Sequence, residues 1–345
     1  MKAIDVSGQA PGGDRMPLAE RLPLATPVLI QFFPIYACNF KCSYCTFSVD
    51  KSERDFISNS IRMDFDLYKK CIDDIAGFPQ KTKVIRFVGM GEPLMHTQIA
   101  DMIAYAKMQN VAERLEILTN ASLLTPTLSD KLIASGLDRL IVSLQGTSGT
   151  KYQEVCATKI DFTAFVDNLR YFHEHKGSAV SHIKIIDLAL QDDTDKARFH
   201  DIFGNICDTI GVEIAGPIFP NVDYDNLLAN NGPSLTQFGR DKLEARFCPQ
   251  PFFTMQINPD GNVVPCYSVT YPEILGNARN ENLVDLWSGP RYNHFRRRML
   301  DGIGQASETC KKCNIVRHRF QPEDRLDEHV VHLRQVFDQK LEKSR

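Results

Sequence analysis

Three cysteines near the start of the chain have a spacing that could bind a metal cluster. Residues 37–47, ACNFKCSYCTF, place Cys38, Cys42 and Cys45 in a Cys-x3-Cys-x2-Cys pattern, which we call the first cysteine set. A structural zinc site needs four ligands, usually supplied as two separated pairs. Three thiolates in one loop instead suit an iron–sulfur cluster with one iron left open for a small chelating molecule. The alternative is a zinc loop completed by a distant ligand such as His96.

Four more cysteines form a second cysteine set near the end of the chain. Cys248 and Cys266 flank residues 258–261, NPDG, whose residue types suit a tight hairpin turn. Cys310 and Cys313 follow in the segment CKKC. Four thiolates can fully ligate either one four-iron cluster or a structural zinc ion. The ligand count alone does not distinguish these two metals.

Composition excludes several classes of partner. The chain has 345 residues with 40 basic and 43 acidic side chains, a formal net charge of −3. This balance gives no electrostatic reason to expect nucleic acid or an anionic membrane as partner. The N-terminus lacks the apolar core of a signal peptide, and no stretch approaches the roughly 20 apolar residues that span a bilayer. We therefore expect a cytoplasmic protein, in which the ten cysteines do not form disulfides.

Strand-like and helical segments alternate along the first two thirds of the chain. The expected strands are 27–34, 83–91, 114–121, 139–146, 182–190 and 212–219. The expected helices are 64–78, 98–110, 128–136 with Ser129 as N-cap, 162–175 and 197–211. This order predicts a parallel sheet with right-handed crossovers, and six such units suit a partial barrel better than a complete eightfold barrel.

The chain divides into four predicted regions. They are a flexible N-terminal segment (1–24), a partial (β/α)6 barrel (25–222), a small cysteine-rich domain (238–320) and a C-terminal helix (321–345). The last region has apolar residues at helical spacing and is expected to pack back on the body. Chemistry in parallel barrels gathers at the C-terminal ends of the strands. The first cysteine set follows the first strand and is therefore expected at that end.

The first cysteine set, with the aromatic Tyr44 before its last cysteine, resembles the radical S-adenosylmethionine (radical SAM) superfamily. The resemblance implies a [4Fe–4S] cluster whose open iron binds the amino and carboxylate groups of SAM. An electron from the cluster then cleaves SAM to a 5′-deoxyadenosyl radical, which abstracts a hydrogen atom from an unactivated carbon. The protein contributes binding, orientation and exclusion of water.

Other motifs at strand ends match the same superfamily. The segment VGMGEP resembles its Gly-Gly-Glu-Pro motif, LTNASLL its TNG segment and VSLQG its SLDG segment. Met90 interrupts the usual glycine pair, Ala121 replaces a glycine and Gln145 replaces an acid. The resemblance implies that SAM contacts come from Tyr44, Gly89, Met90, Gly91, Glu92, Pro93, Asn120, Ser143 and Gln145.

The second cysteine set resembles the SPASM domain and its shortened form, the twitch domain. The resemblance implies that Cys248, Cys266, Cys310 and Cys313 ligate one auxiliary [4Fe–4S] cluster. The full two-cluster form needs more cysteines than remain, so the one-cluster form is favoured. The expected cofactors are therefore SAM and two [4Fe–4S] clusters, one that binds SAM and one auxiliary, with a reductant such as flavodoxin or ferredoxin.

The expected activity is hydrogen abstraction from a small polar substrate such as a sugar, aminocyclitol or nucleotide sugar. A four-cysteine layout of this kind occurs in an aminocyclitol dehydrogenase of the family, and relatives also epimerise their substrates. Dehydrogenation needs a proton acceptor, for which Asp187 and Glu213 are candidates on late strands. Epimerisation needs a hydrogen-atom donor, for which Cys156 is the candidate.

Two alternatives remain open from the sequence. The protein could be a maturase that cross-links, epimerises or forms thioethers in a ribosomally made peptide. Such relatives often have an added N-terminal leader-binding domain, and residues 1–24 show no such pattern. The non-enzymatic alternative is a structural or sensor metalloprotein, which requires the SAM-type motifs to be coincidental. SAM consumption after reduction separates enzyme from sensor.

Overall fold

The computed structural model describes residues 2–8, 12, 15–54, 58, 60–228, 235–267 and 270–343. The strands in these residues are β1 (Ile4–Asp5), β2 (Leu29–Phe32), β3 (Thr82–Phe87), β4 (Ala112–Thr119), β5 (Arg139–Leu144), β6 (Val180–Ile186), β7 (Thr209–Glu213), β8 (Thr254–Ile257), β9 (Asn262–Val264) and β10 (Gly276–Asn277). They form one sheet in the order β1-β7-β6-β5-β4-β3-β2-β8-β9-β10. The sheet is parallel from β1 to β8, and β9 and β10 extend it in antiparallel fashion.

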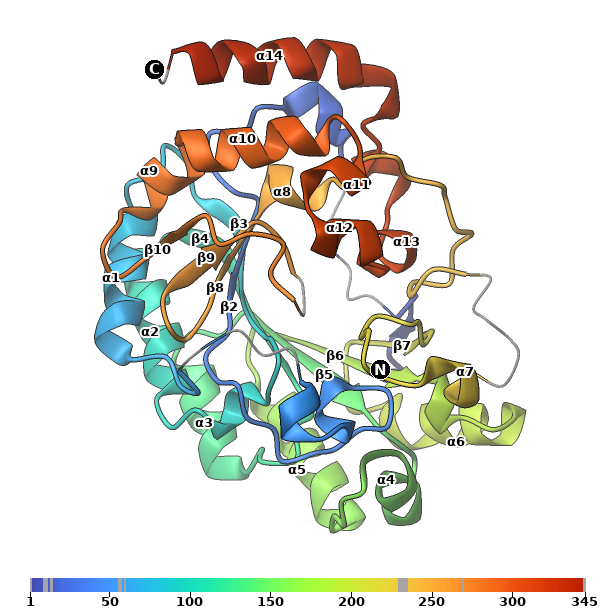
Figure 1. Ribbon diagram of the computed structural model, residues 1–345. Helices are drawn as coiled ribbons and strands as arrows, with labels where there is room; N and C mark the ends of the chain where they lie inside the picture. The colour runs from blue at the N-terminus through green and yellow to red at the C-terminus, as the bar shows by residue number, and fades with distance from the viewer. Residues whose placement is uncertain are drawn as a thin grey trace.

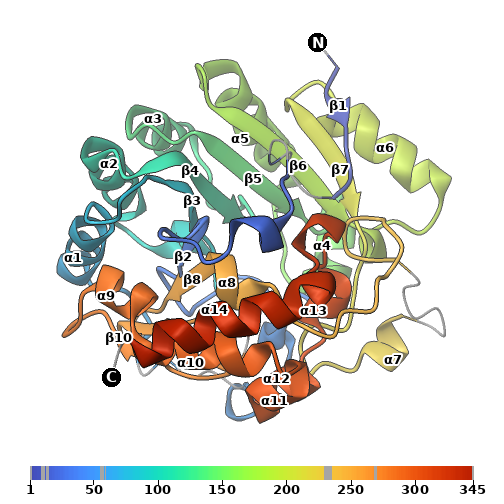
Figure 2. The same cartoon turned by 90° about the horizontal axis from the view of Figure 1, so that it is seen from above.

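Helices cover one face of the curved sheet (Figures 1 and 2). They are α1 (Phe65–Ile75), α2 (Ile99–Gln109), α3 (Pro126–Ala134), α5 (Phe162–His175) and α6 (Asp193–Phe203), with α4 (Gly149–Cys156) at the C-terminal end of β5. Side chains alternate along each strand. On β5, Leu140, Val142 and Leu144 belong to the apolar core under the helices. The residues between them therefore face the interior of the barrel.

The predicted barrel and its C-terminal addition are confirmed as a mixed α/β fold. The N-cap predicted for α3 is wrong: the N-cap is Thr125, whose side chain accepts a hydrogen bond from the backbone N–H of Leu128. Ser129 lies inside this helix and is buried. Pro126 at the first helical position explains why the helix begins there, because proline has no backbone N–H to leave unpaired.

The C-terminal part of the chain continues the barrel sheet. As predicted, β8 and β9 form a hairpin across residues 258–261. Strand β8 also pairs in parallel with β2, in the register Gln31 to Gln256. The helices that follow are α9 (Leu283–Ser288), α10 (Pro290–Met299), α11 (Ile303–Ala306), α12 (Glu308–Lys312), α13 (Ile315–His318) and α14 (Val330–Glu342); α7 (Tyr224–Leu227) and α8 (Gln250–Phe253) precede them.

The last helix packs back on the body, as its apolar spacing predicted. Leu333 and Phe337 of α14 are fully buried in the main apolar core. The Phe337 ring lies 5.6 Å from that of Phe252 in an edge-to-face arrangement. On α10, the guanidinium of Arg296 stacks 4.0 Å from the ring of Trp287, which belongs to the same main core.

The N-terminal segment differs from its prediction as flexible. In its described residues, β1 pairs with β7, and the backbone N–H of Val6 donates to Ile210 at 2.8 Å. Leu18 and Ala19 in a short 3-10 helix, η1 (Leu18–Arg21), are buried in the main core. Further 3-10 turns are η2 (Thr46–Ser48), η3 (Lys51–Glu53), η4 (Pro93–Met95), η5 (Asp187–Ala189), η6 (Pro322–Asp324) and η7 (Asp327–His329). No helix in the described part of the chain is long and apolar enough to cross a membrane.

Candidate active site

The first cysteine set lies in the loop that follows β2, at the C-terminal end of the barrel strands. The backbone N–H groups of Lys41 and Ser43 donate to the carbonyls of Cys156 and Val155 at 3.1 and 2.8 Å. The backbone N–H of Cys45 donates to the carbonyl of Cys42 at 2.9 Å. The end of α4 therefore fixes the loop, and a tight turn joins its last two cysteines.

The surroundings of these thiols suit cluster ligands. The sulfur of Cys38 accepts hydrogen bonds from the backbone N–H of Phe40 at 3.4 Å and from Asn120 Nδ2 at 3.9 Å. Donors of this kind orient and stabilise the sulfur ligands of a cluster. Burial raises the pKa of Cys38 to about 12 and that of Cys45 to about 11. The positive charge of a bound metal ion acts in the opposite direction and keeps a coordinating thiol ionised.

The thiol of Cys42 is hydrogen-bonded to a cysteine outside this set. Its hydrogen bond with Cys156 is the main cause that raises the pKa of Cys42. Among the described residues, no three His, Cys, Asp or Glu side chains already have the arrangement of a metal site. Three mutually interacting thiols with hydrogen-bond donors nonetheless fit a cluster with three protein ligands, provided that Cys42 turns toward the other two.

The two glycines after β3 are required by close backbone approaches. Gly89 has φ +139° and Gly91 has φ +152°, values that favour glycine. A Cβ on Gly89 would lie 2.4 Å from the Phe33 ring, and one on Gly91 would lie 2.2 Å from the carbonyl oxygen of Ile35. Between them the Met90 side chain is buried in a small apolar cluster, so any contact of Met90 with a ligand falls to its backbone.

Glu92 ties this turn to the end of β4. Its carboxylate accepts from the backbone N–H groups of Leu94 at 2.9 Å and Asn120 at 2.7 Å, and also from the Thr119 hydroxyl. Burial raises the pKa of Glu92 to about 7. Pro93 begins η4 directly after it. The structure thus places Glu92, Pro93 and Asn120 together beside Cys38, and their contacts with SAM stay predictions.

Tyr44 and Gln145 are also brought together. The Tyr44 hydroxyl donates to Gln145 Oε1, and Gln145 Nε2 donates to the backbone carbonyl of Ser143 at 3.0 Å. The Tyr44 carbonyl accepts from the Tyr224 hydroxyl at 2.7 Å. These contacts fasten the cysteine loop to the end of β5 on one side and to α7 on the other.

The second cysteine set is assembled from separate elements. Cys248 precedes α8, Cys266 follows β9, Cys310 lies on α12 and Cys313 ends it. Burial raises the pKa of Cys248 first, and the nearby Cys313 and Cys310 raise it further. These three thiols are therefore near one another, and all four cysteines of the set are buried or partly buried, which fits ligands of a cluster or a zinc ion.

A cavity of about 130 Å³ lies inside the barrel, and the C-terminal part of the chain contributes to its lining. Apolar, polar and charged side chains line this cavity. The barrel contributes Gln31, Arg86, Val88, Leu118, Ile141, Lys184 and Glu213, the N-terminal segment contributes Gly8, and the C-terminal part contributes Gln237, Phe238, Tyr267 and Arg319. This cavity is the candidate substrate site.

The predicted catalytic residues differ in their relation to the cavity. Glu213 lines it, and Lys184 Nζ lies 2.5 Å from Glu213 Oε2. Asp187 Oδ1 accepts from the backbone N–H groups of Leu188 and Ala215 at 2.8 and 2.9 Å. Burial raises the pKa of Asp187 and the charge of Glu213 adds to the rise. The two carboxylates are therefore neighbours at the ends of β6 and β7.

Cys156 does not lie where a hydrogen donor to substrate is needed. It is fully buried at the end of α4, and its thiol donates to the carbonyl of Tyr152 at 2.8 Å. It contacts Cys42 behind the first cysteine set and is not among the lining residues of the cavity. The structure gives no support to its predicted role, because its thiol faces the cysteine loop.

Sequence reasoning missed the cations of the cavity: Arg86, Lys184 and Arg319. The signal was present in two of the strands. Arg86 and Lys184 each lie between two buried apolar residues of their strand, at positions where a buried parallel strand normally has an aliphatic residue. Arg319 had no such signal, because it follows a short helix that has no clear periodicity.

Comparisons with known proteins agree with this geometry. Residues 32–197 match the model of the radical SAM superfamily, and residues 248–314 match that of SPASM, an iron–sulfur cluster-binding domain. The chain is 27% identical over 299 residues to the tungsten-containing aldehyde ferredoxin oxidoreductase cofactor-modifying protein of Pyrococcus furiosus, covering 75% of this chain and 80% of that protein. It is 22% identical to the S-adenosyl-L-methionine-dependent 2-deoxy-scyllo-inosamine dehydrogenase of Niallia circulans, covering 84% of this chain and 93% of that protein.

The fold is shared with SuiB of Streptococcus suis, solved with its precursor peptide SuiA. That match has a TM-score of 0.58 at 14% identity and covers 81% of this chain and 69% of the SuiB chain. Both family models match in the order and at the positions that the two cysteine sets predicted. The chain therefore belongs to the radical SAM superfamily and has a C-terminal SPASM domain.

Proposed function

We propose that the protein is a radical SAM oxidoreductase or epimerase that acts on a small polar substrate such as a sugar or aminocyclitol. The observation that supports this proposal is the cavity of about 130 Å³, which is small and has charged side chains in its lining. It lies inside the barrel whose strand ends carry the first cysteine set. The Niallia circulans relative, a 2-deoxy-scyllo-inosamine dehydrogenase by name, also favours a small polar substrate.

The proposed cofactors are SAM and two [4Fe–4S] clusters. The first cysteine set would hold one cluster, and Asn120, whose Nδ2 atom lies 3.9 Å from the sulfur of Cys38, would contact SAM beside it together with the backbone of Gly89 and Gly91. The second cysteine set would hold an auxiliary cluster. When bound, SAM and its cluster supply a hydrogen-abstracting radical, and the auxiliary cluster supplies a route for electrons. A flavodoxin or ferredoxin is the proposed reductant.

Glu213 is the proposed proton acceptor. Its Oε2 atom is held by Lys184, which fixes the orientation of the carboxylate. In the described part of the chain its Oε1 atom has no hydrogen-bond partner although it is buried. A substrate hydroxyl or ammonium group can therefore donate to Oε1 and pass its proton there when the adjacent carbon is oxidised. Asp187, next to Glu213, is the proposed second carboxylate of this step.

The test is a metal analysis followed by an assay on the anaerobic protein. We expect about eight irons with matching sulfide, and deoxyadenosine when SAM and dithionite are added. Zinc in the second cysteine set with about four irons and deoxyadenosine would remove the auxiliary electron route and favour a redox-neutral reaction. Zinc without iron or deoxyadenosine would refute the proposed function.

Substrate class is tested by products. The likeness to SuiB concerns the fold, and SuiB was solved with a peptide, so a peptide substrate is the competing outcome. Incubation of the reduced protein with SAM and panels of aminocyclitols and sugars should give an oxidised or epimerised product. Modification of a peptide but of no member of these panels would overturn the proposal of a small substrate while leaving the radical chemistry intact.

A further inference from the structure

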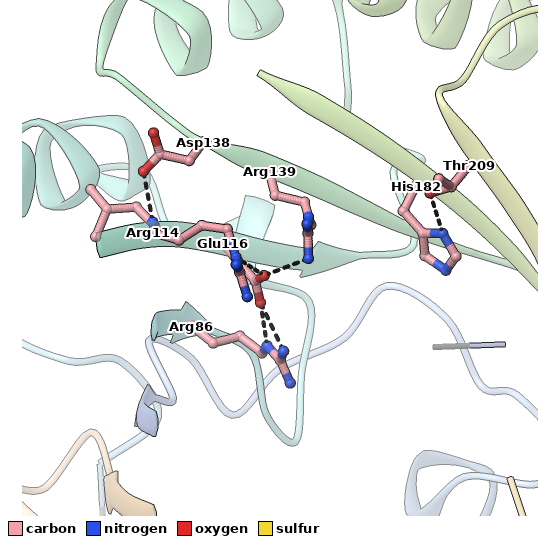
Figure 3. Close-up of polar contacts among 8 residues, drawn as sticks. Arg86, Arg114, Glu116, Asp138, Arg139, His182 and Thr209 are labelled. Carbon is pink, nitrogen blue, oxygen red and sulfur yellow. Dashed lines mark hydrogen bonds and ion pairs between the residues drawn. The ribbon is translucent and has the colours of Figure 1, made fainter. Parts of the chain in front are cut away.

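The interior of the barrel holds a buried carboxylate that is shared by three arginines. Glu116 on β4 is fully buried, and its carboxylate contacts Arg86 at 2.8 Å, Arg114 at 2.5 Å and Arg139 at 3.0 Å (Figure 3). Arg86, Glu116 and Arg139 are register partners on β3, β4 and β5. They therefore form a row across the inner face of the sheet.

A second group of charged side chains lines the cavity. Lys184 on β6 pairs with Glu213 on β7 at 2.5 Å. Arg319, from the C-terminal part, stacks 4.7 Å from the Tyr267 ring and donates from Nε to Gln237 Oε1. Tyr267 follows Cys266 directly, so the loop that carries this cysteine of the second set also forms one wall of the cavity.

The cations of this interior outnumber its carboxylates. Arg86, Arg114, Arg139, Lys184 and Arg319 are five cations, while Glu116 and Glu213 are two carboxylates, and the adjoining Asp187 makes a third. Burial lowers the pKa of Lys184, Glu213 opposes this, and the charges of Arg319 and Arg86 lower it further. The three cavity-lining cations thus act on one another, and a bound anion would relieve their repulsion.

Two buried acceptors mark the same cavity as a ligand site. Gln31 is 4% exposed and Glu213 is 8% exposed. Oε1 of each has no hydrogen-bond partner among the residues that the structure describes. A buried polar atom without a partner costs free energy unless a ligand or water satisfies it. The cavity therefore offers cations for an anionic group and acceptors for a hydroxyl or ammonium group.

We propose that the substrate carries an anionic group, a carboxylate or a phosphate, which Arg319, Lys184 and Arg86 bind inside the barrel. A hydroxyl or ammonium group of the same molecule donates to Oε1 of Glu213. Arg319 is the residue that determines specificity for this anionic group, because its guanidinium comes from the C-terminal part of the chain and lines the cavity. This inference rests on the proposed function and narrows its substrate to an anionic sugar, cyclitol or amino acid derivative.

The test uses the anaerobic, iron-loaded protein with saturating SAM, so that the SAM site is occupied. Inorganic phosphate and succinate are titrated separately by calorimetry. We expect at least one of them to bind, and Arg319→Gln to weaken that binding about tenfold or more, the loss expected for a hydrogen bond to a charged group. Binding of phosphate alone identifies a phosphorylated substrate, and binding of succinate alone identifies a carboxylate substrate.

Arg317→Gln is the matched control, because Arg317 is exposed two residues away and does not line the cavity. It should bind the anion and form deoxyadenosine as the unchanged protein does. If Arg319→Gln fails to retain iron, Arg319→Lys replaces it. Lysine keeps the charge but loses the planar fork, and weaker anion binding is again expected.

The outcomes separate this inference from the proposed function. If neither anion binds, or if the Arg319 variants bind as tightly as the unchanged protein, the anion site is refuted. If the same preparation forms deoxyadenosine, the radical chemistry does not depend on the anion site. Anion binding that depends on Arg319 in a protein that forms no deoxyadenosine would support the site and refute the proposed function.

Discussion

At the scale of single residues, Glu116 is expected to be decisive for stability. Burial alone would raise the pKa of Glu116, but Arg86, Arg114 and Arg139 lower it to about 2. Replacing Glu116 with Gln leaves three arginines around a neutral amide. Removing one partner of a buried ion pair costs about 3–5 kcal/mol. We expect this loss in the free energy of unfolding, measured by urea denaturation.

Glu113→Gln is the control on the same strand. Glu113 pairs with Lys83 at 2.7 Å on the surface, where both side chains are at least half exposed. Exposed pairs contribute about 0–1 kcal/mol, so this variant should unfold almost as the unchanged protein does. Equal losses for the two variants would contradict the role assigned to the buried network.

His182 should make stability depend on pH. Burial, and then the charges of Lys184 and Arg139, lower the pKa of His182 to about 3. The unfolded chain binds this proton near pH 6.5, so stability is lost as pH falls below that value. From pH 7 to pH 5 the loss is about 2 kcal/mol. His182→Gln should flatten the dependence of the unfolding free energy on pH over this range.

The exposed His332 on α14 provides the comparison. His332→Gln should keep the pH dependence of the unchanged protein. The interpretation is wrong if His182→Gln and the unchanged protein lose stability in parallel between pH 7 and pH 5.

The site residues that the sequence predicted best are those of a given type at a fixed spacing along the chain. The cysteines, Gly89 and Gly91 act through short segments of chain, which a sequence displays directly. The interaction of Cys42 with Cys156 could not be predicted from the sequence, because it depends on how α4 packs against the cysteine loop. The arginine cluster around Glu116 was missed for the same reason: its members come from three strands and meet only through register.

At the scale of elements, the last helix should stabilise the whole chain. Leu333 is fully buried on α14, where it packs into the main core. Leu333→Ala removes this contact and should cost about 2–5 kcal/mol. Val331 on the same helix is 68% exposed, and Val331→Ala should change the unfolding free energy by about 0.5 kcal/mol or less. Urea denaturation of both variants measures the difference, and a Leu333 variant as stable as the Val331 variant would show that α14 is not docked.

Element identity was predicted better than element ends. Buried parallel strands form apolar runs in the sequence, and five of the six expected barrel strands overlap β2 to β6. The sixth, expected over 212–219, shares only two residues with β7. The helix expected over 197–211 instead ends at Phe203, and β7 begins at Thr209. Its apolar residues Ile206 and Ile210 continue the helical spacing but belong to a turn and a strand. Strand β1 and helix α4 were missed because two and eight residues, respectively, give too little periodicity.

At the scale of the whole molecule, the two cysteine regions share one sheet. The pairing of β2 with β8 covers what would otherwise be a free edge of the barrel. The sequence predicted a separate small cysteine-rich domain over residues 238–320. The long-range pairing of β8 leaves no local pattern, so only the folded chain reveals that the C-terminal part contributes to the lining of the cavity.

The shared sheet still leaves the two proposed cluster sites chemically independent, because their ligands come from different elements. Replacing the first cysteine set with alanines should leave about four irons and abolish SAM cleavage. Replacing the second set should also leave about four irons, but deoxyadenosine should still form, since the loop after β2 is fixed by α4 and β5. The test is to measure the iron content and the deoxyadenosine yield of both variants, prepared anaerobically. SAM cleavage that survives loss of the first set would overturn its assignment, and loss of all iron from the second variant would show that the two sites form only together.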